Sequence, residues 1–385
     1  MNAIEPVTSA PEPAELDSRL NKVRALMQKQ RLDYYVSAQT DNVYYLTNFA
    51  YFPMERPFFL IIPASGQPTL VLPLLEVSHA GQRVLIDVTY RTYREYPAPA
   101  GLSHVDALKE MIPAGARVGI EKLLPVMHRE IIPGQIVATD LIDEIRLVKS
   151  EYEIGRIAYA CKIVEAGLAK ILELSKPGVQ QLTLYSEGVR QMMGLIVLEV
   201  SQLNLLMTKT LCAVWPGSLS AQPHSVPGLF DSLQAGGPQV TIVTAQADGY
   251  SAELERTFFI GNIPEASRTP FAAMMEARAL AFELIKPGVR AADVDRQVLD
   301  LIKARGFGDA ILHRTGHGFG ITGHEPPWIA MGSENVMAEN MVISIEPGIY
   351  IPGVGGYRHS DTVLVTKDGC QAMTRAPVDL DDLVL

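Results

Sequence analysis

The feature that most constrains the fold is a seven-residue repeat in the second half of the chain. Residues 173–179 read ELSKPGV and residues 283–289 read ELIKPGV, so six of the seven positions are identical at a displacement of 110 residues. Pro and Gly end helices in many proteins, and that alone would make such a match common. Here, however, both copies follow an Ala- and Leu-rich helical stretch and precede a second helical stretch. We therefore predict a duplication, with two α/β halves that face one another and line a common cleft.

The first part of the chain alternates helical and extended patterns. Residues 16–30 repeat apolar residues at helical spacing, and residues 32–38 read as a strand. Further strands are expected at 58–63, 69–73 and 117–121. Such alternation predicts an α/β domain with a mixed or parallel sheet. The predicted organisation is a flexible tail, a smaller N-terminal α/β domain and a larger catalytic domain: residues 1–15, 16–145 and 146–385.

Composition excludes several classes of partner. The net charge is −10 and no Lys/Arg-rich run is present, which argues against binding to nucleic acid or to an anionic membrane. The longest apolar runs are far shorter than a membrane span, and residues 1–15 lack the basic and apolar regions of a signal peptide. The three widely spaced cysteines favour free thiols over disulfides. A cytoplasmic protein is expected.

Candidate site residues gather in the second half. In GYSAELERTFFIG, residues 249–261, the two-residue period of a strand places Glu253 and Glu255 on one face, where like charges need a positive partner. That partner can be a metal ion, a protein cation or the substrate. His317 and His324 lie among glycines in a histidine-rich stretch, and Glu346 ends an apolar strand.

Four ordered stretches carry a family resemblance. GYSAELERTF, HRTGHGFGITGHEPP, ISIEPGIY and GGYRHSDTVLV resemble the motifs of the prolidase, aminopeptidase P and creatinase family. IRLVKSEYEI is similar to the start of that family's catalytic domain. The resemblance covers nearly the whole chain. It implies the pita-bread fold, a pseudo-twofold α/β domain, behind a smaller N-terminal creatinase/prolidase-type domain, and this fits the repeat.

The metal-binding motif departs from the family pattern. Metallopeptidases of the family hold two metal ions with two Asp, one His and two Glu, and the resemblance places these ligands at Ile242, Glu253, His317, Glu346 and Ser360. An aliphatic side chain cannot bind a metal ion, and a neutral Ser is a poor substitute for a bridging carboxylate. We therefore expect no metal cofactor. The alternative is one divalent metal ion held by Glu253, Glu255, His317 and Glu346.

The other site positions resemble those of creatinase, the family member without a metal. The resemblance implies that the catalytic residues are His224, His317, His324 and Glu346. It also implies that the substrate-binding residues are Arg56, Glu253 and Glu255. Arg56 precedes Pro57 in an Arg-Pro pair that, in relatives, reaches the active site of a neighbouring subunit. A homodimer with composite sites is therefore expected.

Three interpretations of function follow. The first is a metal-independent hydrolase that cleaves a C–N bond (amidine, amide or imide-like) in a small cationic or zwitterionic substrate, with His224 as general base. The second is a mononuclear metal-dependent Xaa-Pro dipeptidase or aminopeptidase. The third is a lyase-type or non-catalytic relative that only binds a ligand.

Some neighbouring residues also have structural interpretations. Arg256 can be a core-facing ion-pair residue, and Asp361 can orient Arg358. His313 and His359 can lie at the surface or support the site from outside it. Such roles do not require contact with a substrate.

Overall fold

The computed structural model describes residues 4–385, which divide into two compact units. The N-terminal unit comprises residues 10–146, and the C-terminal unit comprises residues 147–385 together with the segment before residue 10. No helix among the described residues is long and apolar enough to cross a membrane.

The N-terminal unit is built on one mixed six-stranded sheet. Its strands lie in the order β4-β3-β2-β1-β5-β6, with antiparallel pairs β1/β2 and β2/β3 and parallel pairs β3/β4, β1/β5 and β5/β6. The strands are β1 (Tyr34–Ser37), β2 (Phe59–Pro63), β3 (Thr69–Pro73), β4 (Thr89–Tyr93), β5 (Arg117–Ile120) and β6 (Gln135–Ala138). The helices are α1 (Pro13–Gln30), α2 (Thr40–Thr47), α3 (Val77–Arg83), α4 (His104–Met111), α5 (Val126–Arg129) and α6 (Leu141–Arg146).

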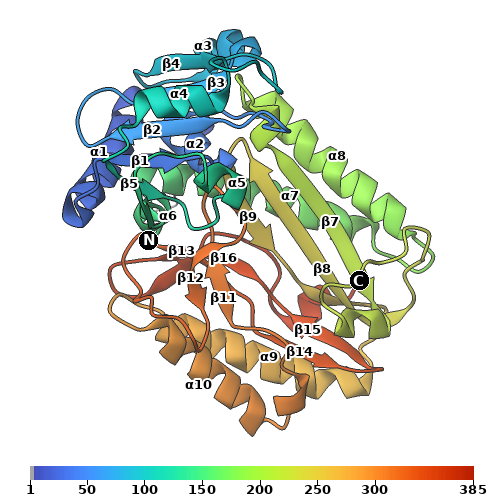
Figure 1. Ribbon diagram of the computed structural model, residues 1–385. Helices are drawn as coiled ribbons and strands as arrows, with labels where there is room; N and C mark the ends of the chain where they lie inside the picture. Colours follow the sequence, from blue (N-terminus) through green and yellow to red (C-terminus); the bar gives the residue numbers. More distant parts are fainter. Residues whose placement is uncertain (1–3) are drawn as a thin grey trace. The chain divides into compact units, whose positions relative to one another are not determined.

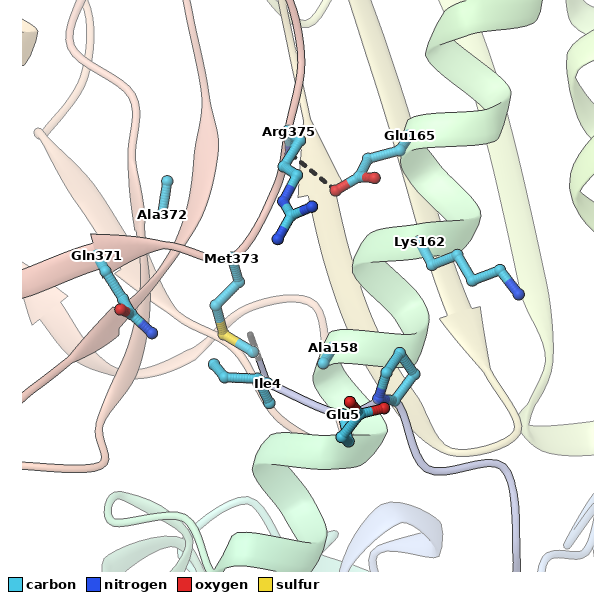
Figure 2. Close-up of a pocket in the computed structure, with 10 residues that line it drawn as sticks. Ile4, Glu5, Ala158, Lys162, Glu165, Gln371, Ala372, Met373 and Arg375 are labelled. Atoms are coloured by element: carbon cyan, nitrogen blue, oxygen red, sulfur yellow. Dashed lines mark hydrogen bonds between the residues drawn. The ribbon is translucent and has the colours of Figure 1, made fainter. Parts of the chain in front are cut away.

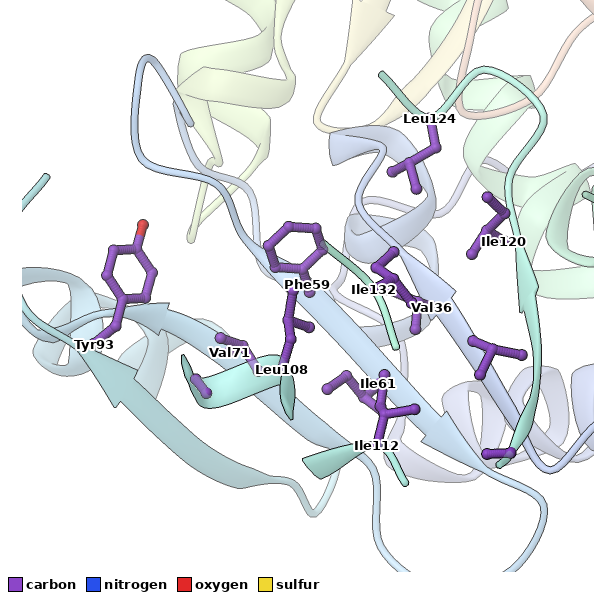
Figure 3. Packing of buried hydrophobic residues seen from close by; sticks show 13 residues of the cluster. Val36, Phe59, Ile61, Val71, Tyr93, Leu108, Ile112, Ile120, Leu124 and Ile132 are labelled. Atoms are coloured by element: carbon purple, nitrogen blue, oxygen red, sulfur yellow. The ribbon is translucent and has the colours of Figure 1, made fainter. Parts of the chain in front are cut away.

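Alternate strand residues build the core of this unit. Val36 on β1, Phe59 and Ile61 on β2, and Ile120 on β5 are buried together, and Leu108 of α4 packs against them (Figure 3). Successive strand residues point to opposite faces, so one face of the sheet carries this apolar layer. Burial of apolar side chains of this size stabilises the unit by roughly 1.5–3 kcal/mol each.

The chain before the first domain differs from the expected flexible tail. Helix α1 begins at Pro13, and residues 4–9, which belong to the C-terminal unit, lie against α7 (Glu151–Leu174). The N–H of Val7 donates to the carbonyl of Gly155 at 2.9 Å, and the hydroxyl of Tyr152 donates to the carbonyl of Ser9 at 3.0 Å. These two hydrogen bonds hold the segment at the helix surface.

The C-terminal unit contains two pairs of helices and three sheets (Figure 1). The helix pairs are α7 with α8 (Gln181–Glu199), and α9 (Glu265–Leu284) with α10 (Ala291–Ala304). One sheet, ordered β10-β8-β7 with β9 also paired to β8, comprises β7 (Lys209–Pro216), β8 (Gly236–Ala247), β9 (Tyr250–Leu254) and β10 (Thr257–Ile260). A second, ordered β12-β11-β13-β16-β17, comprises β11 (Gly316–Gly318), β12 (Glu325–Ile329), β13 (Val342–Ile345), β16 (Asp361–Val365) and β17 (Cys370–Ala372). The third pairs β14 (Gly348–Ile351) with β15 (Gly355–Arg358).

The two copies of the repeat occupy equivalent places. The first lies between α7 and α8, and the second lies between α9 and α10. Gly178 and Gly288 both adopt left-handed backbone, with φ of 87° and 88°, which glycine tolerates without strain. Their N–H groups donate to the carbonyls of Leu233 and Met337, each at 2.9 Å. The same turn with the same hydrogen bond in both halves is the structural signature of the predicted duplication.

The two halves meet where β9 ends. Pairing with β8 is interrupted between Leu254 and Thr257, and there Glu255 pairs instead with Ser360, just before β16. The backbone N–H of Glu255 donates to the carbonyl of Ser360 at 3.1 Å, and the reverse bond measures 3.2 Å. This bridge joins one half-sheet to the other and brings residues from both to one place.

Candidate metal centre

Strand β9 places the two glutamates of the first motif at the junction between the halves. Glu253 lies opposite Thr244 of β8, so the side chains of these two residues point to the same face. Ile242, two residues before Thr244, therefore presents an aliphatic side chain to that face as well. The strand expected over residues 249–261 is divided into β9, which ends at Leu254, and β10, which begins at Thr257. Even so, Glu253 and Glu255 contribute carboxylate oxygens to one cluster, as their spacing predicted.

Glycines on both sides of His317 allow its short strand to fit between its neighbours. A Cβ on Gly316 would lie 2.2 Å from the carbonyl oxygen of Ser344, and one on Gly318 would lie 2.4 Å from that of Pro326. No side chain fits at those distances. We expected these glycines to allow close approach of both backbone and ligand. The atoms that approach them in the structure are backbone atoms of the adjoining strands.

His317 and Glu346 form the buried centre of the site. The Nε2 atom of His317 lies 3.2 Å from Oε1 of Glu346. Ser344 connects the two residues, because its hydroxyl accepts from the N–H of His317 at 2.9 Å and donates to Glu346 at 3.3 Å. Burial opposes ionisation of Glu346, but the adjacent imidazole of His317 and its positive charge hold the pKa of this carboxyl well below its usual range. Burial lowers the pKa of His317, and the carboxylates of Glu346 and Glu253 more than offset this and raise it.

Glu253 occupies the middle of the acidic group. Its Oε1 accepts a hydrogen bond from the hydroxyl of Ser360 at 2.9 Å, and its N–H donates to the hydroxyl of Thr362 at 3.1 Å. Burial and the negative charge of Glu346 raise the pKa of Glu253. A cation would relieve that repulsion.

Glu255 already has a protein cation beside it. Its Oε1 accepts from Nη2 of Arg358 at 2.6 Å, and its Oε2 is in direct contact with Nε of the same guanidinium. Sequence reasoning missed Arg358 as a site residue. The signal that could have found it is an arginine two residues before Ser360, on the strand that faces the glutamates.

Two further histidines lie near this centre. The ring of His324 stacks on that of His317, with centroids 3.7 Å apart. Burial and the charge of His317 lower the pKa of His324 to about 4. His224 is exposed in the loop after β7, and its charge contributes to lowering the pKa of both His324 and His313. The proposed proton carrier is therefore accessible to solvent.

Arg56 belongs to the N-terminal unit. It forms ion pairs there with Glu55 at 2.8 Å and with Glu95 at 2.5 Å, and its side chain is 28% exposed. Its expected reach into a partner's site, like the homodimer, stays a prediction.

The donor atoms fit a divalent metal ion. Atoms of Glu253, His317 and His324 lie within 4.8 Å of one another, and so do atoms of Glu253, Glu255 and Glu346. Nδ1 of His317 lies 3.2 Å from the carbonyl oxygen of Gly318, so Nδ1–H donates there and Nε2 is the ring nitrogen that faces the carboxylates. Among residues 4–385 that buried Nε2 has no hydrogen-bond partner. Carboxylate oxygens and an imidazole nitrogen suit Mn, Co or Zn.

A separate cavity in the C-terminal unit lies away from these residues (Figure 2). It measures about 380 Å³, and Glu165 on its wall accepts a hydrogen bond from the N–H of Arg375 at 2.7 Å. The residues that line it are Ile4, Glu5, Pro6, Ala158, Lys162, Glu165, Gln371, Ala372, Met373 and Arg375. They include none of the site residues, so this cavity is not the metal centre.

Comparison with family models identifies both parts of the chain. Residues 155–367 match the model described as metallopeptidase family M24, and residues 19–148 match the creatinase/prolidase N-terminal domain. The two matches fall in the C-terminal and the N-terminal unit respectively. The expected α/β fold, with a pita-bread domain behind a creatinase/prolidase-type N-terminal domain, is confirmed.

Individual proteins are similar over nearly the full length. A putative dipeptidase of Bacillus subtilis is 31% identical over 349 residues, which cover 88% of this chain and 93% of that protein. A Xaa-Pro dipeptidase of Pyrococcus horikoshii is 28% identical and covers 95% and 99%. The crystal structure of the prolidase from Pyrococcus horikoshii superposes with a TM-score of 0.82 at 26% identity, covering 94% of this chain and 99% of that one.

These findings correct the expectation of a site without metal. A metallopeptidase model matches the domain that holds the cluster, and the donor atoms of Glu253, His317 and His324 converge there. The predicted absence of a metal cofactor is wrong. Ile242 and Ser360 remove two ligand positions, but their loss leaves the convergence of the other donors intact.

Proposed function

The chain belongs to metallopeptidase family M24, and on that premise we propose that it is a metal-dependent dipeptidase. Its substrates would be short peptides with a free amino terminus, and Xaa-Pro dipeptides are the first class to test. This is the peptidase interpretation of the sequence, in place of the metal-independent hydrolysis of an amidine.

The names of the relatives support this choice. The Bacillus subtilis relative is a putative dipeptidase, and the Pyrococcus horikoshii relative is a Xaa-Pro dipeptidase. Their similarity extends over both units of the chain, so it is not confined to a shared domain.

The observation that carries the proposal is the convergence of unused donor atoms. Nε2 of His317 is buried, has no hydrogen-bond partner among residues 4–385 and lies 3.2 Å from Oε1 of Glu346, while Glu253 lies in the same acidic group. A cluster with more carboxylates than cations is costly in a protein interior unless a positive ligand completes it. We assign Glu253, His317 and Glu346 as the metal-binding residues, with His324 beside them.

The chain's own residues prepare the site for peptide hydrolysis. A divalent ion, when bound, polarises a carbonyl group and lowers the pKa of a bound water molecule. Ser344 fixes the orientation of both His317 and Glu346, and Ser360 fixes that of Glu253. His324 stands at the exposed edge of the cluster, where its imidazole can hydrogen-bond a substrate group. His224 at the rim can carry a proton between this edge and solvent.

The test combines metal content with peptide hydrolysis. Protein stripped with a chelator should lose Xaa-Pro dipeptidase activity and regain it with Mn²⁺, Co²⁺ or Zn²⁺. Glu253→Gln should lower metal affinity and kcat/KM by at least about a hundredfold, because even partners of metal ligands contribute that much. The matched control is Glu165→Gln, which neutralises a half-buried carboxylate in the separate cavity and should change neither quantity.

Either of two results would refute the proposal. If metal-free protein hydrolyses dipeptides at the rate of metal-loaded protein, the ion is not part of the activity. If neither form cleaves any dipeptide but both cleave an amidine or guanidine substrate, the alternative hydrolase is correct instead.

A further inference from the structure

We propose that the buried guanidinium of Arg358 acts as the second cation of the site, so that the chain binds one divalent metal ion and not two. The inference rests on the proposed function only in requiring that a metal ion binds. It adds the number of metal ions bound per chain. It also gives a joint role to Glu255 and Arg358, which no sequence motif had linked.

The first observation is that Arg358 uses both oxygens of Glu255. Nη2 donates to Oε1 at 2.6 Å, and Nε contacts Oε2. The side chains of Arg358 and Glu255 are 5% and 1% exposed. A planar guanidinium that binds a carboxylate through two parallel contacts is the strongest form of this ion pair. Glu255 is therefore paired with a protein cation at both of its oxygens, and its negative charge is already balanced within the chain.

The second observation is that Arg358 is held from its other side as well. Its Nη1 donates to the hydroxyl oxygen of Tyr350 at 3.1 Å. That hydroxyl lies 2.7 Å from Nε2 of His313, whose Nδ1 lies 2.7 Å from the carbonyl of Arg314. The carbonyl oxygen can only accept, so Nδ1–H of His313 donates to it and the Tyr350 hydroxyl donates to Nε2. The guanidinium is thus a fixed part of the site and cannot swing away to admit an ion.

The third observation is the balance of formal charge. Glu253, Glu255 and Glu346 carry three negative charges within one cluster. Arg358 contributes one positive charge, which leaves two negative charges, and one divalent ion neutralises these. A second divalent ion would leave two positive charges uncompensated in a buried site, at a desolvation cost of several kcal/mol per ion. Ile242 and Ser360 contribute no charge at the positions where family resemblance places carboxylates.

The experiment measures metal stoichiometry and affinity directly. Isothermal titration of stripped protein with Mn²⁺ and with Co²⁺, and elemental analysis of the loaded protein, should both give one ion per chain. Glu255→Gln should weaken binding at least about tenfold, because Arg358 then keeps its charge without its partner.

The double variant Glu255→Gln/Arg358→Gln separates the two possible roles of Glu255. It replaces a buried ion pair with two neutral amides of similar shape, a change that proteins tolerate far better than the loss of one partner. If Glu255 acts only by pairing with Arg358, the double variant should regain wild-type affinity for one ion within about threefold. If the double variant stays as weak as Glu255→Gln, then Glu255 is a metal ligand and the inference is overturned. Arg278→Gln, which removes a cation outside the cluster, is the control and should leave metal binding unchanged.

The outcomes distinguish this inference from the proposed function. Two ions per wild-type chain together with dipeptidase activity would overturn the role of Arg358 and leave the peptidase proposal standing. No bound ion would overturn both. One ion without dipeptidase activity would support the role of Arg358 and overturn the dipeptidase.

Discussion

Two buried charge clusters lie on opposite sides of the same junction between the halves, and they differ in how their charges are balanced. The first, called the metal cluster below, is the group of carboxylates at the candidate metal centre: Glu253, Glu255 and Glu346. These carboxylates outnumber the protein cations beside them, and Arg358 is the cation that is held in place. In the second cluster, one carboxylate, that of Asp361, is bound by two arginines.

The second cluster is saturated. Oδ1 of Asp361 accepts from Arg256 at 2.9 Å and from the hydroxyl of Thr374 at 3.0 Å. Its Oδ2 accepts from Nε and Nη2 of Arg278 at 3.1 and 2.6 Å. Arg256 is the core-facing ion-pair residue that the sequence allowed, whereas Asp361 binds Arg256 and Arg278 rather than Arg358. Every acceptor position is filled from within the chain, so this cluster has no place for a ligand.

The comparison shows how one junction supports both structure and function. Glu255 and Arg256 are adjacent, as are Ser360 and Asp361, and successive residues in extended chain point to opposite sides. On the side of Asp361, every polar atom of the carboxylate is hydrogen-bonded within the chain. On the side of the glutamates and His317, carboxylate and imidazole atoms remain without hydrogen-bond partners among the described residues. A buried cluster that lacks positive charge marks the side that binds a ligand.

The largest expected effect is a difference in the free energy of unfolding between variants of the two clusters. Asp361→Asn should lower the free energy of unfolding by about 3–5 kcal/mol, because it leaves the buried Arg256 and the partly buried Arg278 without their anion. Glu253→Gln should leave the stability of the metal-free protein unchanged or higher, since it removes one of several repelling charges. Urea unfolding followed by circular dichroism measures both. Equal losses in the two variants would show that the metal cluster is as much a structural element as the saturated one.

The next effect is on catalysis alone. His224→Ala should lower kcat by about a hundredfold, the usual scale for loss of a proton-transfer group. The exposed position of His224 predicts no change in the unfolding midpoint. His79→Ala, in the N-terminal unit, is the control. A wild-type rate would place His224 outside the reaction, as a loop histidine beside the metal cluster.

Much of the fold was predictable, because it depends on local patterns. The helix–turn–helix repeats follow from Lys-Pro-Gly stops between apolar helices, and Glu253 and Glu255 reach one cluster as their spacing required. The break after Leu254 was not predictable, because it arises from pairing between Glu255 and Ser360, more than a hundred residues away. The same distance hid the pairing of Arg358 with Glu255. Because the sequence did not reveal this pairing, the absence of carboxylates at Ile242 and Ser360 suggested a site without metal. The structure shows that the cation beside Glu255 is Arg358.

A smaller effect concerns pH and the saturated side. Burial, together with the charges of Arg256 and Arg278, holds the pKa of His359 well below its usual value. The ring packs edge-on against Phe271 and is neutral in the folded protein. Since its pKa is depressed on folding, its contribution to stability is complete above the unfolded pKa of about 6.5 and is lost as the pH falls below it. One pH unit below that value the loss is about 1.4 kcal/mol.

The measurement compares urea unfolding of the wild type and His359→Gln from about pH 7.5 to about pH 5.5, the range that brackets the unfolded pKa. The variant should show the shallower loss of stability on acidification, because it has no proton to take up at this position. Parallel pH profiles would mean that His359 is protonated without cost in the folded state, and that the charge of the saturated cluster does not reach it.

The smallest stability effect is expected at an ion pair that belongs to neither buried cluster. Arg56 pairs with Glu55 and Glu95 at the surface of the N-terminal unit, and exposed pairs of this kind contribute about 0–1 kcal/mol. Arg56→Ala should therefore scarcely change unfolding. If, as predicted, Arg56 binds substrate in the site of a partner subunit, the same variant should raise KM for a dipeptide by about tenfold or more, since a charge-assisted hydrogen bond contributes about 1.5–3 kcal/mol.

Mixing the chains decides whether Arg56 acts across a dimer. Heterodimers of Arg56→Ala and His224→Ala chains would hold one site with both residues intact and one with neither, so activity should rise above that of either variant alone. Analytical ultracentrifugation establishes whether the chain dimerises, and exchange between differently tagged chains establishes that heterodimers form. A monomeric protein, or exchanged chains without any recovery, would assign Arg56 to the surface of its own unit. In that case the charged side chains needed for function would all belong to the buried metal cluster, next to the saturated cluster around Asp361.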